Sequence, residues 1–186
     1  MSDQLEVRVA DEVDADAVAA LVERAYRGES SRAGWTSEAD YVGGSRTSGT
    51  AVRELITDTH TAVLLGERDG QLVACCQVTS LQNGEAYLGM LAVEPTIQNG
   101  GLGRRMVEAA ERVARERWAA AALRIHVLSV QSALADWYRR LGFVDAGDRV
   151  PFPAGTDAEV LVAGLDFLIM TKQIASVSQP TTGPAV

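Results

Sequence analysis

The chain has 186 residues, of which 47% are hydrophobic, a length and composition typical of one globular domain with a substantial core. Lys and Arg number 17 against 25 Asp and Glu, and the formal net charge of −8 argues against nucleic acid or an anionic membrane as the main partner. The N-terminal stretch lacks the apolar segment of a signal peptide, and no apolar run is long enough to span a membrane, so we expect a cytoplasmic protein.

The first elements in the chain are a strand and a helix. Residues 5–10 alternate between apolar and polar side chains, as a half-buried strand does. Apolar residues then recur at helical spacing over 13–25, and Gly28 is expected to end this helix. Two further short helices are predicted near 37–43 and 50–57.

Three strands connected by tight turns follow. The runs at 60–67, 71–80 and 86–93 have the composition of strands. Asp69-Gly70 and Asn83-Gly84 stand between them, and both dipeptides are strong hairpin signals. We therefore predict an antiparallel three-strand meander.

The second half alternates helices and strands, and its last residues have the composition of a disordered tail. The whole order is β-α-α-βββ-α-β-α-ββ, which predicts a mixed α/β or α+β fold over 1–174 and not a doubly wound sheet. In chain order the expected elements are a helix after the glycines at 100–103, a strand at 122–128, a helix at 131–141, strands near 143–147 and 160–173, and a tail at 175–186.

Cys75 and Cys76 are neighbours in a predicted strand, so their side chains point to opposite faces. They are poorly placed to bind one metal ion or to form a disulfide. We interpret them as ordinary strand residues in a reducing compartment, and we predict no metal site.

The segment VEPTIQNGGLGRRM places glycines and two arginines at the start of a helix. A P-loop would need Lys and then Ser or Thr after the glycines, and a dinucleotide fingerprint would need Gly or Ala where Met106 stands. Cations at a helix N-terminus cost roughly 0.3–1 kcal/mol each, which an anion bound to the free backbone N–H groups would offset. The alternative is a glycine-rich turn whose arginines point into water.

Two motifs resemble one enzyme family. The spacing Gln98-x-x-Gly101-x-Gly103 directly after MLAVEP is similar to the acyl-CoA signature of the Gcn5-related N-acetyltransferase (GNAT) family. A second stretch with Tyr138, Gly142 and Phe143 resembles that family's later strand-helix segment. The order of elements matches from about residue 5 to 173.

This resemblance implies a GNAT-like fold, with a mixed sheet of about seven strands flanked by helices and splayed between the fourth and fifth strands. Acetyl-CoA would enter the gap, its pantetheine along the fourth strand and its pyrophosphate on the glycine loop. Gly89 in that strand favours a bulge or a close backbone approach; the alternative is a glycine that only weakens the strand. The family often has Asn where Gln131 stands, which leaves that contact open. The implied cofactor-binding residues are Leu91, Ala92, Val93, Gln98, Asn99, Gly100, Gly101, Leu102, Gly103, Arg104, Gln131 and Tyr138.

Acyl transfer to an amine needs a base, an oxyanion donor and an acid. The resemblance implies Tyr138 as the acid for the departing thiolate, although Tyr138 could instead be a core aromatic. His126 stands where related enzymes have a base, and imidazole suits proton transfer near neutral pH; the alternative is a strand histidine without a role. A backbone N–H near Leu91 would stabilise the oxyanion.

The acceptor would enter beside residues 29–59, where Trp35, Glu38 and Tyr41 are candidates for binding it; solvated helix charges are the alternative. We predict an N-acetyltransferase that uses acetyl-CoA and acts on a primary amine of a small molecule or a peptide. A non-catalytic acyl-CoA sensor and the transfer of a longer acyl group are the alternatives. The identity of the acceptor is left open, as is the oligomeric state, with a homodimer as one option.

Overall fold

The structure is a computed structural model that describes residues 5–32, 34, 37–98, 100–153 and 159–174. Two predicted site residues, Trp35 and Asn99, and the predicted tail at 175–186 lie outside these residues. None of the helices in the described part of the chain is both long and apolar enough to cross a membrane.

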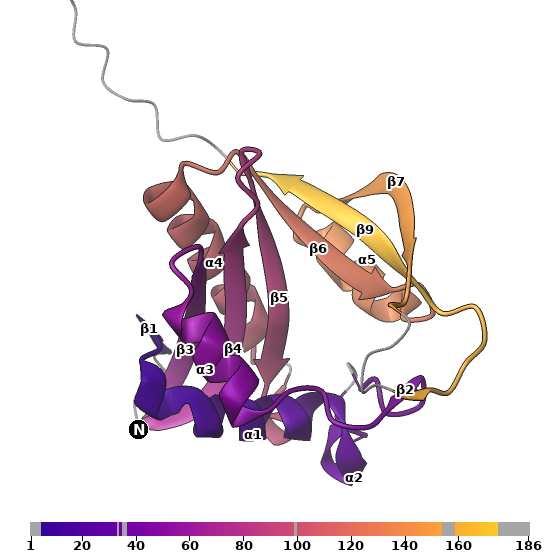
Figure 1. Cartoon of the computed structure of the whole chain (residues 1–186), viewed down its shortest axis with the longest axis horizontal. Coiled ribbons are helices and arrows are strands. Elements are labelled where there is room, and N and C mark those ends of the chain that lie inside the picture. Colours follow the sequence, from indigo (N-terminus) through magenta and orange to yellow (C-terminus); the bar gives the residue numbers. More distant parts are fainter. Residues whose placement is uncertain (1–4, 33, 35–36, 99, 154–158, 175–186) are drawn as a thin grey trace, which may run out of the picture.

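Within the described residues, seven strands form one mixed sheet in the order β1-β3-β4-β5-β6-β9-β7, with two short strands pairing separately (Figure 1). All neighbours in the large sheet are antiparallel except β5 and β6, which are parallel. The predicted mixed sheet and its meander, β3 to β5, are confirmed. The bounds are β1 (Glu6–Val9), β2 (Val42–Gly43), β3 (Thr61–Arg68), β4 (Gln71–Ser80), β5 (Glu85–Val93), β6 (Ala122–Leu128), β7 (Val144–Pro151), β8 (Glu159–Val160) and β9 (Asp166–Gln173).

Helices cover both faces of the sheet, and a separate core lies under each face (Figure 1). One core contains the buried faces of α1 and α3, and the other contains those of α4 and α5. Cys75 belongs to the first core and Cys76 to the second, as their adjacency predicts. The helices are η1 (Glu12–Asp14), α1 (Ala15–Tyr26), α2 (Gly28–Ser31), α3 (Gly49–Thr57), η2 (Pro95–Ile97), α4 (Leu102–Trp118) and α5 (Ser132–Arg140).

Three local predictions differ from the structure. The helix predicted at 37–43 is wrong, since the carbonyl of Glu38 accepts from the N–H groups of Tyr41 and Val42 in one turn before β2 begins. Gly28 does not end the first helix, because α1 already ends at Tyr26 and Gly28 begins α2. The strand predicted at 160–173 is two strands, β8 and β9, separated by a turn at Gly164, whose φ is 71°.

The splay expected between the fourth and fifth strands is confirmed between β5 and β6. Only Glu85 to Tyr87 of β5 pair with β6, and beyond Tyr87 the strands diverge (Figure 1). Next to Gly89, the register against β4 gains one residue, and Met90 adopts a left-handed φ of 52°. This bulge bends β5 and opens the gap that the sequence predicted. At Gly89 itself, a Cβ atom would lie 2.5 Å from the ring of Tyr87.

Candidate functional site

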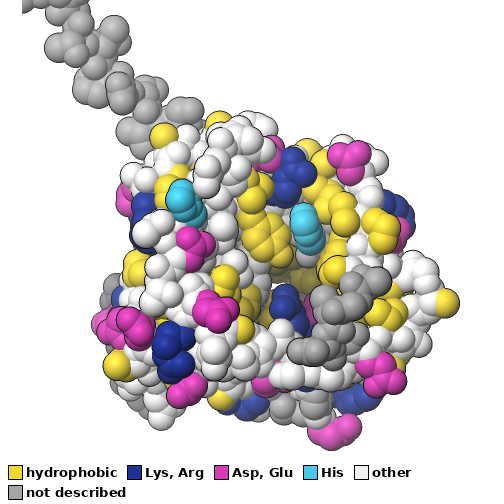
Figure 2. Space-filling model, in the orientation of Figure 1, with side chains coloured by type: hydrophobic (Ala, Val, Ile, Leu, Met, Phe, Trp, Pro, Cys, Tyr) yellow, Lys and Arg dark blue, Asp and Glu magenta, His cyan; other side chains and the backbone are white. Residues whose placement is uncertain are grey.

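Two hollows in the described part of the molecule meet at the gap between β5 and β6. One, called the cavity here, has a volume of about 550 Å³ and lies between β5, β6 and the loop before α3. The other, called the groove, has a volume of about 530 Å³ and lies between β5, the start of α4, and α5. The residues that line both are Tyr26, Leu91, Leu134 and Tyr138. Figure 2 shows a central hollow in one face of the molecule, with hydrophobic side chains, a histidine and Lys or Arg side chains around it.

The groove ends at the N-terminus of α4. Gly101 caps this helix with a left-handed φ of 74°, a conformation that other residue types adopt at a cost. A Cβ at Gly103 would lie 3.3 Å from the ring of Trp137, so glycine allows α4 and α5 to approach closely. No described side chain caps the helix and its first turn contains no acidic residue. The free N–H groups and the positive end of the helix dipole therefore face the groove, together with Arg104.

The β5 wall of the groove follows strand alternation. Leu91 and Val93 line the groove, whereas the side chain of Ala92 is buried in the core beneath α1. Gln98 also lines the groove, and its side-chain amide donates a hydrogen bond of 3.3 Å to the carbonyl of Val93. Leu102, the first residue of α4, completes this wall.

Tyr138 lies where the groove and the cavity meet. It is 7% exposed, and its ring forms edge contacts with Trp137 at 4.8 Å and Phe143 at 5.3 Å between ring centroids. Its hydroxyl makes no hydrogen bond with any other described residue. Burial raises the pKa of Tyr138 well above its usual value, so the hydroxyl stays protonated. Tyr138 is therefore a core aromatic whose protonated hydroxyl lies on the wall that the groove and the cavity share.

His126 lines the cavity from β6. Its ring lies between the rings of Tyr87 and Phe167, at centroid distances of 5.1 Å and 5.8 Å. Partial burial of the imidazole, with the nearby charge of Arg124 as a smaller cause, lowers the pKa of His126 from its usual value of 6.5. The imidazole is therefore neutral at physiological pH and can accept a proton.

The predicted acceptor residues are not gathered in one place. Glu38 lines the cavity, but its carboxylate already accepts from the buried Arg27 at 2.8 Å. Tyr41 packs in a small apolar cluster with Val42 and Leu128. Gln131, expected at the cofactor, lines the cavity, and its amide donates to a backbone carbonyl of the loop before β2.

The sequence did not single out the contribution of the end of α1. Tyr26 lines both hollows, and its hydroxyl donates a hydrogen bond of 2.7 Å to the carbonyl of Leu91 on β5. Arg27 follows directly, and Arg46 reaches the same cavity wall from the loop before α3. A tyrosine and an arginine at the end of an amphipathic helix are the only local signal for this wall, because its parts meet only in the fold.

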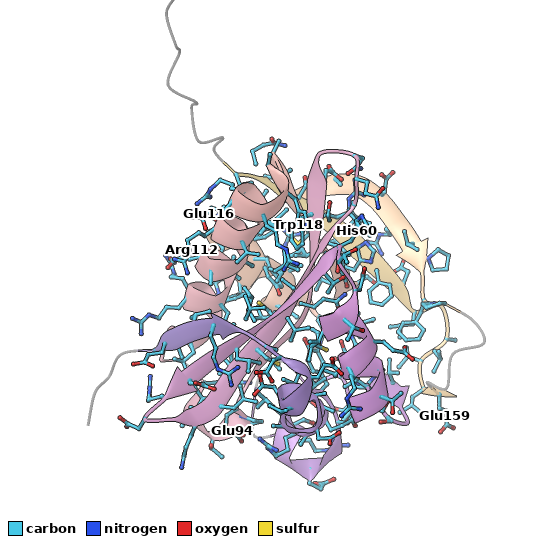
Figure 3. All side chains as sticks on the ribbon, turned by 60° about the vertical axis from the view of Figure 1, so that its left-hand side comes forward. His60, Glu94, Arg112, Glu116, Trp118 and Glu159 are labelled. Carbon is cyan, nitrogen blue, oxygen red and sulfur yellow. The ribbon has the colours of Figure 1, made fainter. Side chains whose placement is uncertain are left out.

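His60 and Glu94 lie apart from this site. His60 precedes β3 and Glu94 follows β5, and since these strands run in the same direction the two residues lie at opposite ends of the sheet (Figure 3). His60 is exposed, and Glu94 forms an ion pair of 3.0 Å with Arg24. Neither lines the cavity or the groove.

Comparison with known proteins gives one family and one fold. The model of the acetyltransferase (GNAT) family matches residues 18–143. An amino-acid acetyltransferase of Pseudomonas putida is 33% identical over 87 residues, which are 46% of this chain and 19% of that protein. One from Pseudomonas syringae is 33% identical over 102 residues, 53% of this chain and 22% of that protein. The chain thus matches about a fifth of the length of these relatives.

Solved structures share the fold over nearly the whole chain. The ribosomal-protein-S18-alanine N-acetyltransferase of Escherichia coli superposes with a TM-score of 0.69 at 20% identity, covering 97% of this chain and 99% of that one. The yncA protein of Salmonella typhimurium, determined with its cofactor acetyl-CoA, superposes with a TM-score of 0.67 at 17% identity, covering 97% and 99%. At these identities the likeness concerns the fold alone.

Proposed function

The chain belongs to the GNAT family of acetyltransferases, and on that premise we propose that it transfers the acetyl group of acetyl-CoA to a primary amine by direct attack. One observation carries the proposal: the groove and the cavity meet at Leu91 and Tyr138, inside the gap between β5 and β6. A donor in the groove and an acceptor in the cavity would share this wall. Direct attack requires such contact, since no enzyme nucleophile carries the acyl group.

The residues of the groove fit acetyl-CoA. The uncapped N-terminus of α4, with Gly101, Gly103 and Arg104, offers N–H groups, a helix dipole and a positive charge to an anionic pyrophosphate. Beyond Tyr87, β5 is no longer paired with β6, so backbone groups on that edge of the strand can bond the amides of pantetheine as a neighbouring strand would. In this proposal Gln98 and Leu102 shape the wall, and acetyl-CoA supplies an activated thioester at the junction.

The chemistry follows from the two perturbed side chains. An alkylamine with a pKa of about 10.4 is protonated at neutral pH and must lose a proton before it attacks. Neutral His126, directly or through water, takes that proton. The N–H of Leu91, beside the bulge at Met90, stabilises the oxyanion. Protonated Tyr138 then donates its proton to the departing thiolate.

Catalysis accounts for these features better than acyl-CoA sensing does. A sensor needs the groove, but it has no use for a neutral histidine and a protonated tyrosine on the wall of a second cavity. Only experiment can distinguish the transfer of an acetyl group from the transfer of a longer acyl group. The cytoplasmic location and the homodimer stay predictions.

The test combines acetyl-CoA binding with CoA release. Calorimetry should detect acetyl-CoA binding, and CoA thiol should appear only when both acetyl-CoA and a suitable amine are present. If acetyl-CoA binds but no CoA is released with any member of a panel of amino acids, polyamines and peptides, the protein is an acyl-CoA sensor and not an enzyme. Propionyl-CoA and octanoyl-CoA in the same assay decide the acyl length.

A further inference from the structure

We propose that the acceptor amine carries a carboxylate, and that Arg46 binds this carboxylate on the wall of the cavity. The inference rests on the proposed acetyl transfer and deepens it by naming the class of acceptor, a small amino acid rather than a polyamine or a lysine of a protein. It is carried by the charge of the cavity, by the unused donors of Arg46 and by the position of its guanidinium relative to the junction.

The described side chains that line the cavity have a net positive charge, although the chain as a whole is acidic. Apart from His126, the acidic and basic side chains among the described residues that line it are Arg27, Glu38 and Arg46. Arg27 and Glu38 form a close pair of 2.8 Å whose side chains are 9% and 14% exposed. This pair cancels its own charge and leaves that of Arg46. A hollow with a net positive charge, in a protein with a net charge of −8, favours an anionic ligand.

The guanidinium of Arg46 has donors that the protein does not use. It makes no hydrogen bond with any described residue, and the nearest carboxylate oxygen among those residues, on Glu38, is 3.9 Å away. Its side chain is 35% exposed, so the group is reachable from the cavity. The planar fork of an arginine matches a carboxylate through two parallel hydrogen bonds.

Arg46 is also held in place, which reduces the entropy lost when it binds a ligand. On α1, the carboxylate of Glu23 accepts from the backbone N–H groups of Arg46 and Thr47, at 2.5 Å and 2.7 Å. The guanidinium lies over the ring of Tyr26, 5.4 Å from its centroid. Glu23 and Tyr26 are therefore positioning residues for this arginine.

Tyr26 joins the proposed carboxylate site to the reacting end. Its ring lies under Arg46, and its hydroxyl donates to the carbonyl of Leu91 at the junction. A molecule with its carboxylate on Arg46 and its amine at the junction would lie along the side chain of Tyr26, and from this we infer the short skeleton of an amino acid. In this arrangement Glu38 orients the two arginines instead of holding a cationic amine.

The experiment compares free amino acids with their α-carboxamides as acceptors. L-Glutamate, L-methionine, L-phenylalanine and L-alanine are each offered in both forms, and CoA release gives kcat/KM. The amine of the amide is less basic, so a larger fraction of it is unprotonated and reactive near neutral pH. This difference favours the amide and therefore opposes the preference that we expect. We expect the best free acid to exceed its amide at least about tenfold, since a site built for an ionic hydrogen bond rejects the analogue without it.

Variants of Arg46 assign the preference. Arg46→Gln should lower kcat/KM for the acid about 100-fold and leave the amide within about threefold, with unchanged acetyl-CoA affinity. Arg46→Lys, which keeps the charge without the fork, should restore part of the loss. Arg53→Gln is the matched control, because the side chain of Arg53 on α3 is 42% exposed and lies outside the cavity, so its replacement should have no effect.

The outcomes separate the inference from the proposed function. Equal use of acid and amide, a preference that survives Arg46→Gln, or acetylation of spermidine and lysine peptides alone would overturn the carboxylate site and leave the acetyltransferase standing. If acetyl-CoA binds and no amine releases CoA, the proposed catalysis fails. The carboxylate site is then judged by titrating the free acids into the CoA-saturated protein. Binding that Arg46→Gln abolishes supports the site, and no binding overturns it.

Discussion

Replacing Tyr138 with phenylalanine removes one oxygen atom and keeps the ring contacts with Trp137 and Phe143. Because the hydroxyl bonds to no other described residue, its loss should change the free energy of unfolding by no more than about 0.5 kcal/mol. Without the hydroxyl, the thiolate must leave unprotonated from a dry site. General acid catalysis is worth about 10²–10⁴ in rate, so kcat should fall by that factor. The affinity for acetyl-CoA should stay nearly constant, since binding does not use the proton.

Three measurements on the same variant test this separation: steady-state CoA release, calorimetry with acetyl-CoA, and urea unfolding. Phe143→Leu is the converse control, because it truncates a fully buried neighbour of Tyr138 and should reduce stability while activity per folded molecule persists. A Tyr138→Phe protein with turnover within about threefold of the parent would refute the acid role. A large loss of stability would show that the hydroxyl serves the fold.

Three other substitutions test the remaining parts of the site. In the parent, kcat/KM should fall as the pH drops below 6.5, because the imidazole of His126, whose pKa is lowered, becomes protonated there. His126→Ala should abolish this fall, and the rate of the variant should partly recover at higher pH. A loss of activity that is the same at every pH would reject the base role. The same lowered pKa means that the unfolded chain binds the proton first, so the parent loses stability, by urea unfolding, as the pH falls through this window. Gly101→Glu should weaken acetyl-CoA binding more than about tenfold by calorimetry, since it sets a negative charge against the pyrophosphate. Gly70→Glu has the same φ of 74° in an open turn and should show only the conformational cost; equal affinity in both would refute the loop site. Gly89→Ala should displace the ring of Tyr87 and lower activity in the same CoA-release assay, and an unchanged rate would show that this contact is unimportant.

The sequence predicted the strands because their signals are local. Hairpin dipeptides and alternating apolar residues depend on neighbours in the chain, and β3, β4 and β5 appear where they indicate. The glycine loop at the start of α4 could be recognised for the same reason, since a helix N-terminus is built from consecutive residues. The failed helix at 37–43 contains only one turn of helical bonds before the pairing of Val42 with Val160 draws the chain into β2.

The wall of the cavity could not be predicted in the same way. It joins Arg27 at the end of α1, Arg46 in a loop and His126 on β6, which are far apart in the chain. The ion pair of Glu38 could not be predicted from its own position, because its partner Arg27 is brought close only by the fold. The bulge was placed near Gly89, yet the left-handed residue is Met90, a position at which sequence propensity would favour glycine.

Cys75 and Cys76 give this protein a pair of built-in reporters. Each thiol is buried, one on either side of the sheet, and burial raises the pKa of Cys75 to about 12 and that of Cys76 well above its usual range. The thiolate is the form that reacts with alkylating reagents, so neither cysteine reacts until the helices that cover it move away from the sheet. The modification rates at the two neighbouring positions, resolved by mass spectrometry, therefore compare how often the α1 side and the α4 side open.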